Sequence, residues 1–494
     1  MTRLKSIIIL VILSISAYGQ NLTDALRYSQ LTSGGSARVM GAGGAFGAMG
    51  GDFGVTSLNV SGIADYRSSE LIFSLSYNQA NVTSTHEGEV IGETNDGRET
   101  ILENIAFIKH IKPYGNLVTS NWAIGLQQYT NYNQTITFNT DTPGSIVERF
   151  ALDANRDNYS AFGAELADNA GAIFFEPDPD PEIEGEMGLY LNDPLGNAIN
   201  KNQVIERSGR INELVFNWAG MYENGLRIGA GIGIPFVNFE ENKFYTENDT
   251  DDSPEDFNRL NYNESLSTSG IGWNFKLGIG YSIKKKIRLG LGVQSPTWMR
   301  LDDDFSTSLL YDCGACSATG TLFESIPGFF EYKLRTPARL TASIGYLLLT
   351  DDVKGFINLD AQFIDYTQNS FNFTDNNDDP NEVFFQNEVN GEINNELRNT
   401  INYNLGAELA YKKIRGRAGI SLQASPFFLD SNFDKIYSAG FGYRLDNIFI
   451  DFAYQFRSFS EGYVPYLAPT EAGDLNLIND TNVNKFIMTL GFKL

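Results

Sequence analysis

Residue types that most often perform chemistry are scarce in this chain. Its 494 residues include only two histidines, His86 and His110, and two cysteines, Cys313 and Cys316. Nucleophilic catalysis needs a base that a third side chain holds in place, and the sequence offers no such set. We therefore expect no enzyme activity, no catalytic residues, no metal site and no cofactor.

Basic residues are few as well. The chain has 36 lysines and arginines against 61 acidic residues, which gives a net charge of −25. A protein that binds nucleic acid needs a positive surface, so we expect no nucleic-acid partner. Much of the acidity lies in polar segments such as 302–304 and 375–379, which are typical of solvated loops.

Long apolar runs are missing after the first twenty residues. Arg3 and Lys5 precede an apolar run over residues 7–17, and small residues follow it. This order is typical of a cleaved export signal, which we assign to residues 1–19. No later run reaches the roughly eighteen apolar residues that a membrane-spanning helix needs.

The two cysteines, Cys313 and Cys316, have the spacing of a redox motif. The βαβ context of a thioredoxin-like site is absent around them. In an exported chain, two cysteines so close together favour a local disulfide that stiffens an outer loop.

What the chain has in abundance is alternation of apolar and polar residues. In the last segment, apolar residues occupy every second position from Phe486 to Leu494, and Thr489, Gly491 and Lys493 lie between them. A period of two is that of a β-strand, and an apolar outer face suits lipid. Similar segments lie at 228–234, 271–281, 340–346, 357–363, 401–411, 437–443 and 448–456.

Short and long connections alternate between these segments, as in outer-membrane barrels. We predict an all-β fold, a transmembrane antiparallel β-barrel of about fourteen strands over residues 70–494, monomeric and in the bacterial outer membrane. The predicted long polar loops are 81–100, 131–205, 241–259, 303–327, 374–394 and 462–482.

The longest of these loops, 131–205, contains apolar clusters and is interpreted as a lid over the barrel mouth. Four residues in it, Phe174, Phe175, Leu189 and Leu191, fit a surface groove for a hydrophobic ligand. Packing of the lid on itself explains them equally well.

Residues 20–69 are rich in glycine and lie outside the strands. Gly41 and Gly43 resemble the start of a dinucleotide-binding loop, but Phe46 stands where the third glycine belongs and no strand precedes them. A barrel of this size is too wide for its own side chains to fill, so we interpret the segment as a hatch inside the lumen. Its close-packed glycines are Gly41, Gly43, Gly44, Gly47 and Gly62.

The hatch resembles that of the long-chain fatty acid transporter family of outer-membrane proteins, which includes FadL and TodX. The run from Ala37 to Phe46 matches, and Asn59 to Ala64 resembles the family's Asn-Pro-Ala-Gly-Leu-Ala motif, with Val60 and Ser61 in place of Pro and Ala. Further similar segments are Ser295-Pro296-Thr297-Trp298, Thr336-Pro337-Ala338-Arg339 and Ser425-Pro426.

The resemblance implies passive uptake of hydrophobic small molecules, such as long-chain fatty acids or hydrocarbons. In the family the ligand leaves by movement of the hatch or sideways through an opening at a distorted third strand. Gly125, in the middle of the third predicted strand, is the candidate for such a kink, and relief of crowding is the commoner reason for a glycine in a barrel strand. We place hatch contacts to the ligand at Phe46, Asn59 and Val60. The expected partners are outer-membrane lipid and hydrophobic small molecules.

Two other functions remain open on the same architecture. One is a non-transporting barrel that serves as a docking or shuttle partner for exported proteins. The other is a haem receptor, for which His86 in a predicted loop is the candidate ligand.

Overall fold

The computed structural model describes residues 21–494, apart from positions 33, 114 and 157 and the segments 178–187, 193–198, 251–256, 314–319, 374–379 and 469–474. The predicted export signal, Cys316 and the acidic run 375–379 therefore lie outside the described residues.

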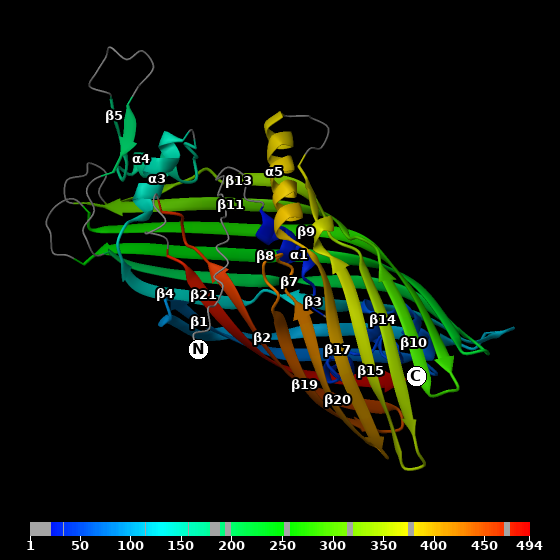
Figure 1. Ribbon diagram of the computed structural model, residues 1–494. Helices are drawn as coiled ribbons and strands as arrows, with labels where there is room; N and C mark the ends of the chain where they lie inside the picture. The colour runs from blue at the N-terminus through cyan, green and yellow to red at the C-terminus, as the bar shows by residue number, and fades with distance from the viewer. Residues whose placement is uncertain are drawn as a thin grey trace.

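Nineteen strand segments form one antiparallel sheet that closes on itself (Figure 1). The sheet closes where β1 pairs with β21, from Glu70 opposite Lys493 to Thr85 opposite Ile478. The segments are β1 (Glu70–His86), β2 (Glu89–Ile111), β3 (Leu117–Asn131), β4 (Gln134–Thr142), β7 (Ile199–Tyr222), β8 (Leu226–Asp249), β9 (Arg259–Ile283), β10 (Ile287–Gln294), β11 (Trp298–Asp312), β12 (Thr321–Glu324), β13 (Gly328–Arg335), β14 (Arg339–Leu349), β15 (Val353–Asp365), β16 (Ser370–Asn372), β17 (Asn399–Tyr411), β18 (Ile414–Ala424), β19 (Phe433–Arg444), β20 (Ile448–Tyr463) and β21 (Leu477–Lys493).

Four pairs of these segments are interrupted single strands. β10 and β11 both pair with β9, one after the other along its length. On their other side, β10 pairs with β14 and β11 with β13, so β13 and β14 together form the next strand. The pairs β3 with β4 and β15 with β16 behave likewise, and β12 only extends the sheet at β11. The barrel thus has fourteen strands, which confirms the predicted fold class.

Two neighbouring barrel strands bend at proline. Pro296 separates β10 from β11, and Pro337 separates β13 from β14. Proline cannot donate to the ladder, so regular pairing stops there. A single backbone bond, from Thr336 N to Thr297 O at 2.9 Å, joins the two bends.

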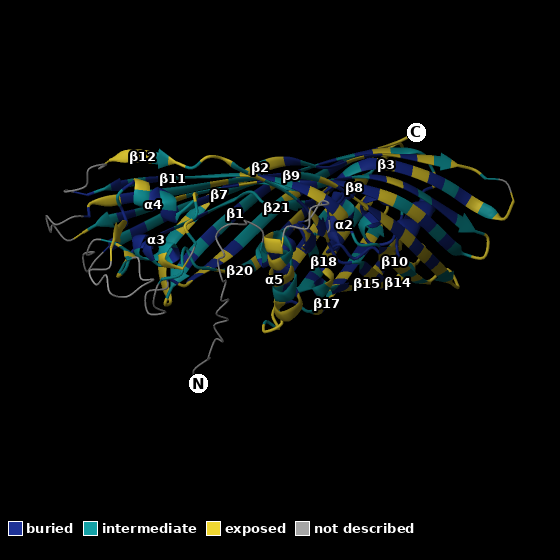
Figure 2. Cartoon of the chain, turned by 90° about the horizontal axis from the view of Figure 1, so that it is seen from above, coloured by how far each residue is buried: buried dark blue, intermediate teal, exposed yellow. Residues whose placement is uncertain are grey.

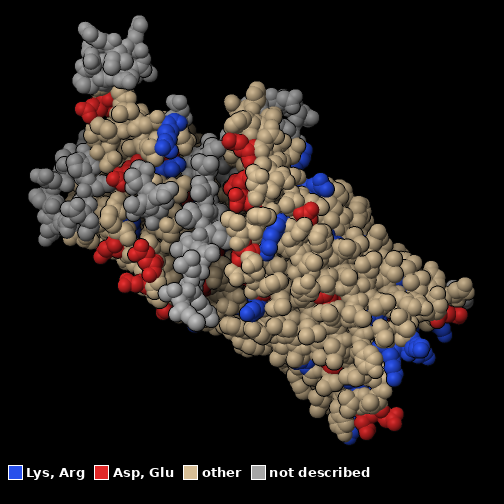
Figure 3. Space-filling model, viewed as in Figure 1, with Lys and Arg blue, Asp and Glu red and all other residues tan. Residues whose placement is uncertain are grey.

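The predicted alternation of faces is clear in strands such as β14, β20 and the second half of β9. On β21, Phe486 is 51% exposed, whereas the next residue, Ile487, is 2% exposed. Figure 2 shows the same alternation as bands of buried and exposed residues along the strands. On the face seen in Figure 3, charged side chains are sparse across the strand wall and gather at the turns and the outer end.

Several predicted loops are strands instead, and those predictions were wrong. The segment 81–100 belongs to a hairpin in which only Glu87 and Gly88 make the turn between β1 and β2. Likewise, β8 and β9 have 24 and 25 residues and take up most of 241–259. These parts pair through backbone bonds although their side chains lack an apolar face, and they make one side of the barrel longer than the other (Figure 1).

The predicted lid loop is shorter than 131–205, because β4 and β7 extend into it. Its described remainder forms a small folded unit, whose residues Val147, Ala167 and Ile173 share one apolar core with strand residues such as Tyr245 and Leu309. The elements of this unit are α3 (Ile146–Asn155), α4 (Ala164–Asn169), β5 (Phe174–Glu176) and β6 (Leu189–Leu191). The predicted loop 374–394 likewise contains a helix, α5 (Pro380–Glu396).

The N-terminal segment, residues 21–66, packs against the buried face of the strands. Its elements are α1 (Leu22–Ser29), α2 (Ala37–Gly41) and two 3₁₀ helices, η1 (Phe53–Ser57) and η2 (Val60–Asp65). α2 contacts β18 to β21, whereas η2 contacts β3, β7, β8 and β9. The segment therefore reaches both sides of the barrel. None of the helices in the described part of the chain is long and apolar enough to cross a membrane.

Candidate functional site

Short polar caps fix the path of the N-terminal segment. Asp52 caps η1 by accepting from the Gly54 amide at 3.0 Å, and it also accepts from the Ser36 hydroxyl at 2.8 Å. Because Ser36 in turn caps α2, one carboxylate links two helical turns. Burial raises the pKa of the Asp52 carboxyl above its usual value.

Asn59 joins the segment to the wall. Its side chain accepts from the Ser61 amide at 3.1 Å, which caps η2, and donates to the carbonyls of Gly47 at 2.8 Å and Ile279 at 3.1 Å. Asn59 and Val60 are 2% and 1% exposed, and Phe46 is fully buried against Phe356. The structure thus brings the three predicted hatch contacts together, in positions where they hold the segment in place.

The predicted glycines allow close approach of backbones. A Cβ on Gly43, which has a φ of +66°, would lie 2.8 Å from the Ile420 amide nitrogen, and one on Gly41 would lie 3.1 Å from Gly440 Cα. The barrel wall also has small residues at these contacts. Gly47 approaches Ser343 and Asp360, Gly62 packs within the segment against Gly50, and Gly44 has a φ of +73°.

Buried charges tie the segment to the wall in both directions. Asp65 of the segment pairs with Arg227 at 2.6 Å and Arg288 at 2.9 Å. Arg38 of the segment pairs with Glu408 on β17 at 3.1 Å, and Arg417 pairs with the same carboxylate at 2.6 Å. Breaking such pairs is costly, because the remaining charge stays buried without a partner.

An aromatic cluster fills the space between α1, α5 and the wall. Phe373 stacks on Phe385 of α5 with ring centroids 5.3 Å apart and on Phe371 at 5.5 Å. Tyr28 of α1 and Tyr332 of β13 are each 2% exposed in the same core. Sequence reasoning missed this cluster because α5 was taken as a loop. Its buried residues, Phe385, Val389 and Ile393, have the four-residue spacing of an amphipathic helix.

The third barrel strand is distorted where it meets the N-terminal segment. Pairing of β3 with β2 ends at Gln127, and the register with β7 shifts between Gln128 and Thr130. The Thr32 hydroxyl donates to the Tyr129 carbonyl, and the Gln127 side chain donates to the Gly34 carbonyl at 3.0 Å. Thr32 and Gly34 therefore lie beside the distortion.

A buried ionic group holds the other side of this distortion. Tyr129 donates to Glu213 at 2.8 Å and accepts from Lys276 at 2.9 Å, and Lys276 also pairs with Glu213. Gly125 itself is regularly paired with Ala106 and Val215. The register shift lies three residues beyond it, and Gly125 instead gives room to Phe53, whose ring would lie 2.6 Å from a Cβ there.

One small cavity lies between the segment and the wall at this level. A cavity of about 10 Å³ lies between Thr56, Leu58, Lys276, Arg339 and Thr341. That volume holds about one water molecule. In this conformation the segment and the wall are in close contact here.

The four predicted lid residues come together in the β5–β6 hairpin, away from the N-terminal segment (Figure 1). Phe174 lies opposite Leu191, and Phe175 lies one position along, opposite Tyr190. The side chains of the four predicted lid residues, Phe174, Phe175, Leu189 and Leu191, are 38–59% exposed. The core beneath the lid unit consists of other residues, which come from α3, α4 and the barrel strands that they contact.

Of the two histidines, His86 lies apart from the N-terminal segment, whereas His110 contacts Asn121, which donates to the carbonyls of Ile63 and Tyr66 in the segment. His86 Nδ1 is 2.9 Å from the Asn476 carbonyl oxygen, and His110 Nδ1 is 2.8 Å from Asn121 Oδ1. Cys313 is disulfide-bonded and almost fully buried in the core of the lid unit.

Comparison with known proteins places the fold. No family model matches the chain, and no curated protein matches it in sequence. Among solved structures, the Pseudomonas putida toluene transporter TodX has a TM-score of 0.52 at 10% identity over 94% of this chain and 98% of that one. The barrel fold is FadL-like.

Two further structures are similar to the same extent. A Pseudomonas aeruginosa FadL homologue has a TM-score of 0.51 at 10% identity over 94% of this chain and 99% of that one. The Ralstonia pickettii toluene transporter TbuX has a TM-score of 0.50 at 12% identity over 94% and 99%. At such identities the likeness concerns the fold.

Proposed function

We propose that this protein is an outer-membrane channel for the passive movement of hydrophobic small molecules, with residues 20–69 as its hatch. Long-chain fatty acids and hydrocarbons are the proposed substrate class. The observation that carries the proposal is the contact of Thr32 and Gly34 with the distorted part of β3. At this part of β3, pairing with β2 ends and the register with β7 shifts, so movement of the segment is proposed to open the wall here.

The aromatic cluster under α5 supports the same function. Phe371, Phe373 and Phe385 offer an apolar lining between the outer face and the N-terminal segment. Burial of a hydrocarbon gains about 0.8 kcal/mol for each CH₂ group, so no charged anchor is needed. The small cavity next to Lys276 fits a resting state in which the hatch is closed.

The test is uptake by cells and by proteoliposomes that carry the purified barrel. We expect faster entry of labelled fatty acid or toluene than in empty liposomes, and extraction of the purified protein should release a lipid or hydrocarbon. Equal entry with and without the protein, together with no extracted ligand, would refute transport.

A docking barrel for exported proteins is the second candidate. The folded lid unit favours it, because Phe174, Phe175, Leu189 and Tyr159 expose apolar surface at the outer end. Deletion of the β5–β6 hairpin separates the two functions. It should leave small-molecule uptake unchanged if the first function holds, and it should abolish retention of an exported partner if the second holds.

A further inference from the structure

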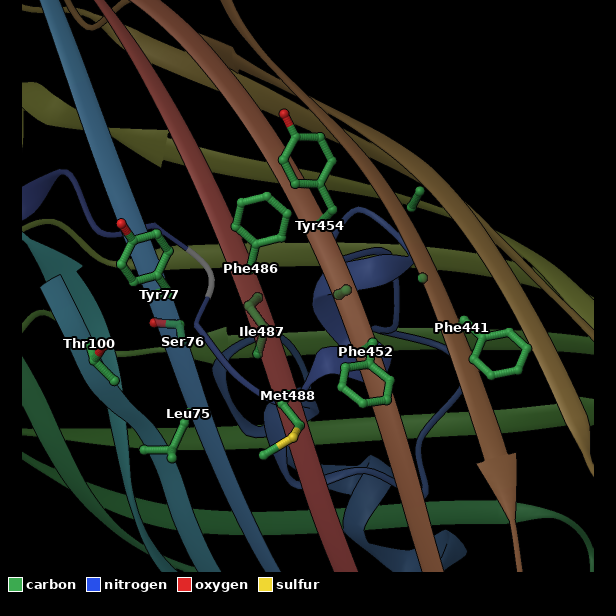
Figure 4. Close-up of a pocket in the computed structure, with 13 residues that line it drawn as sticks. Leu75, Ser76, Tyr77, Thr100, Phe441, Phe452, Tyr454, Phe486, Ile487 and Met488 are labelled. Atoms are coloured by element: carbon green, nitrogen blue, oxygen red, sulfur yellow. The ribbon is translucent and has the colours of Figure 1, made fainter. Parts of the chain in front are cut away.

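The outer surface of the barrel carries an apolar groove of about 630 Å³ on β1, β21, β20 and β19 (Figure 4). The aromatic side chains of Tyr77, Phe486, Tyr454, Phe452 and Phe441 point outward around it. None of the residues that line it is charged.

Strand register explains why the groove has two parallel ridges. Across β1, β21 and β20, Tyr77 lies opposite Phe486, and Phe486 lies opposite Tyr454. Two residues along the strands, Met488 lies in the same way between Leu75 and Phe452. The ridges are about 7 Å apart, and the groove runs across four strands, or about 14 Å.

The first ridge ends at a small residue. Opposite Tyr454 on β19 stands Ala439, where the second ridge has Phe441 opposite Phe452. The aromatic rings of Tyr454 and Phe486 are in contact, with centroids 4.9 Å apart, and the Tyr454 hydroxyl donates to Asn484. The first ridge therefore has no bulky side chain at Ala439.

The floor of the groove is backed by the N-terminal segment. It consists of the inward row Ser76, Ile487, Ala453 and Gly440, which lie opposite one another across the four strands. On the inner side, α2 packs directly against Ala453 and Ile487. In this conformation α2 therefore supports the floor of the groove from inside the barrel.

We propose that this groove holds one acyl chain of a membrane phospholipid. It is continuous with the exposed apolar face of the barrel, which faces hydrocarbon if the barrel lies in a membrane. A free fatty acid would find no cation in the groove for its carboxylate, whereas the headgroup of a phospholipid stays in the polar interface. Contact with two ridges and a floor gives an acyl chain more packing partners than a flat wall does.

The site rests on the membrane location that the proposed function includes, and it does not depend on transport. The experiment uses the full barrel in nanodiscs of phosphatidylethanolamine and phosphatidylglycerol, which is then moved into mild detergent. Native mass spectrometry counts the phospholipids that stay bound. Ala439→Trp places a bulky side chain in the groove where the first ridge ends. Its control is Ala342→Trp, an exposed position on β14 between Leu291 and Ala361.

We expect the wild type and A342W to retain a phospholipid and A439W to lose it. If A439W does not assemble, as judged by its heat-dependent migration in gels, Phe486→Ala removes part of one ridge and should also lose the lipid. Equal retention by the groove variant and the wild type overturns the proposal. So does loss in A342W, a bound free fatty acid or a second barrel in place of the lipid.

A barrel that enters no nanodisc overturns the membrane location and this site together. A barrel that enters nanodiscs but shows no groove-dependent lipid overturns the site alone.

Discussion

The carboxylate of Asp65 lies 2.6 Å from the guanidinium of Arg227, and both groups are largely removed from solvent. The arginine side chain is 1% exposed and the aspartate side chain 10%. Arg288 reaches the same carboxylate, so one acid in the N-terminal segment neutralises two cations of the wall. This grouping fixes the segment at its C-terminal end.

Asp65→Asn should loosen the segment. Two buried guanidinium groups would keep their charge without an anion, and breaking a buried pair in this way costs about 3–5 kcal/mol. We expect faster proteolysis and faster hydrogen exchange in residues 21–66, while the barrel keeps its resistance to unfolding in detergent. The control is Glu331→Gln, which removes the partner of the exposed Arg300 and should change neither measurement.

Phe385→Ala and Phe384→Ala compare two neighbouring residues on α5. Phe385 is 7% exposed and stacks on Phe373, whereas Phe384 is 64% exposed. Loss of the buried ring should cost about 3–5 kcal/mol of local stability, and loss of the exposed ring should cost roughly 0.5 kcal/mol or less. Hydrogen exchange across 380–396 measures both. Equal protection in the two variants would contradict the packing of α5 on the aromatic cluster.

The same helix shows where sequence reasoning was limited. The strands were predictable because apolar residues occupy the outward positions and polar or small residues the inward ones. This alternation leaves a period of two in the sequence. In α5, three apolar residues separated by asparagines and glutamates gave a weak helical signal inside an acidic segment. The prediction of a loop at residues 81–100 was wrong for a related reason. Strands beyond the apolar band pair through their backbones and need no apolar face, so the sequence shows no alternation there.

The outer groove and the distortion of β3 could not be predicted from the sequence, for another reason. Each depends on register between strands that lie far apart in the chain, as in the pairing of Tyr77 with Phe486. Gly125 illustrates this. A glycine in a strand signals either a kink or a close approach, and only the position of Phe53 decides between them.

Gly43→Trp tests whether close packing of the segment matters. A side chain at this position meets the backbone of β18, since even a Cβ would lie 2.8 Å from the Ile420 nitrogen. We expect displacement of α2 and altered uptake, with the fourteen strands still assembled. Gly416→Trp is the matched control, because nothing lies within 4 Å of a Cβ there. Unchanged uptake by a correctly assembled G43W barrel would show that the hatch is passive.

The buried carboxyl of Asp52 predicts a pH dependence of stability. Its pKa is raised by burial above 3.8, so the folded state binds the proton more tightly than the unfolded state does. The contribution of Asp52 to stability is therefore most favourable at low pH and falls as the pH rises from 3.8 through the raised pKa. Asp52→Asn removes this titration.

Thermal unfolding of the wild type and D52N over a pH series measures the effect. We expect the wild type to lose stability relative to D52N as the pH increases, since all other groups are shared. Parallel curves for the two proteins would contradict the pKa shift.

Gly34→Ala addresses the route of the substrate. A Cβ at Gly34 would overlap the carbonyl oxygen of Gln128, at the register shift of β3. The variant must therefore move Gly34 and the neighbouring Thr32 away from the strand, which breaks the hydrogen bond from Thr32 to Tyr129. If substrate passes sideways at this distortion, separation of the two should raise the rate of uptake in proteoliposomes, because the segment no longer covers the irregular part of the wall. Gly416→Ala, which has open space around the new methyl group, should leave the rate unchanged. An increase in hydrogen exchange around residue 34 without any change in uptake would exclude the sideways route and leave passage past the hatch.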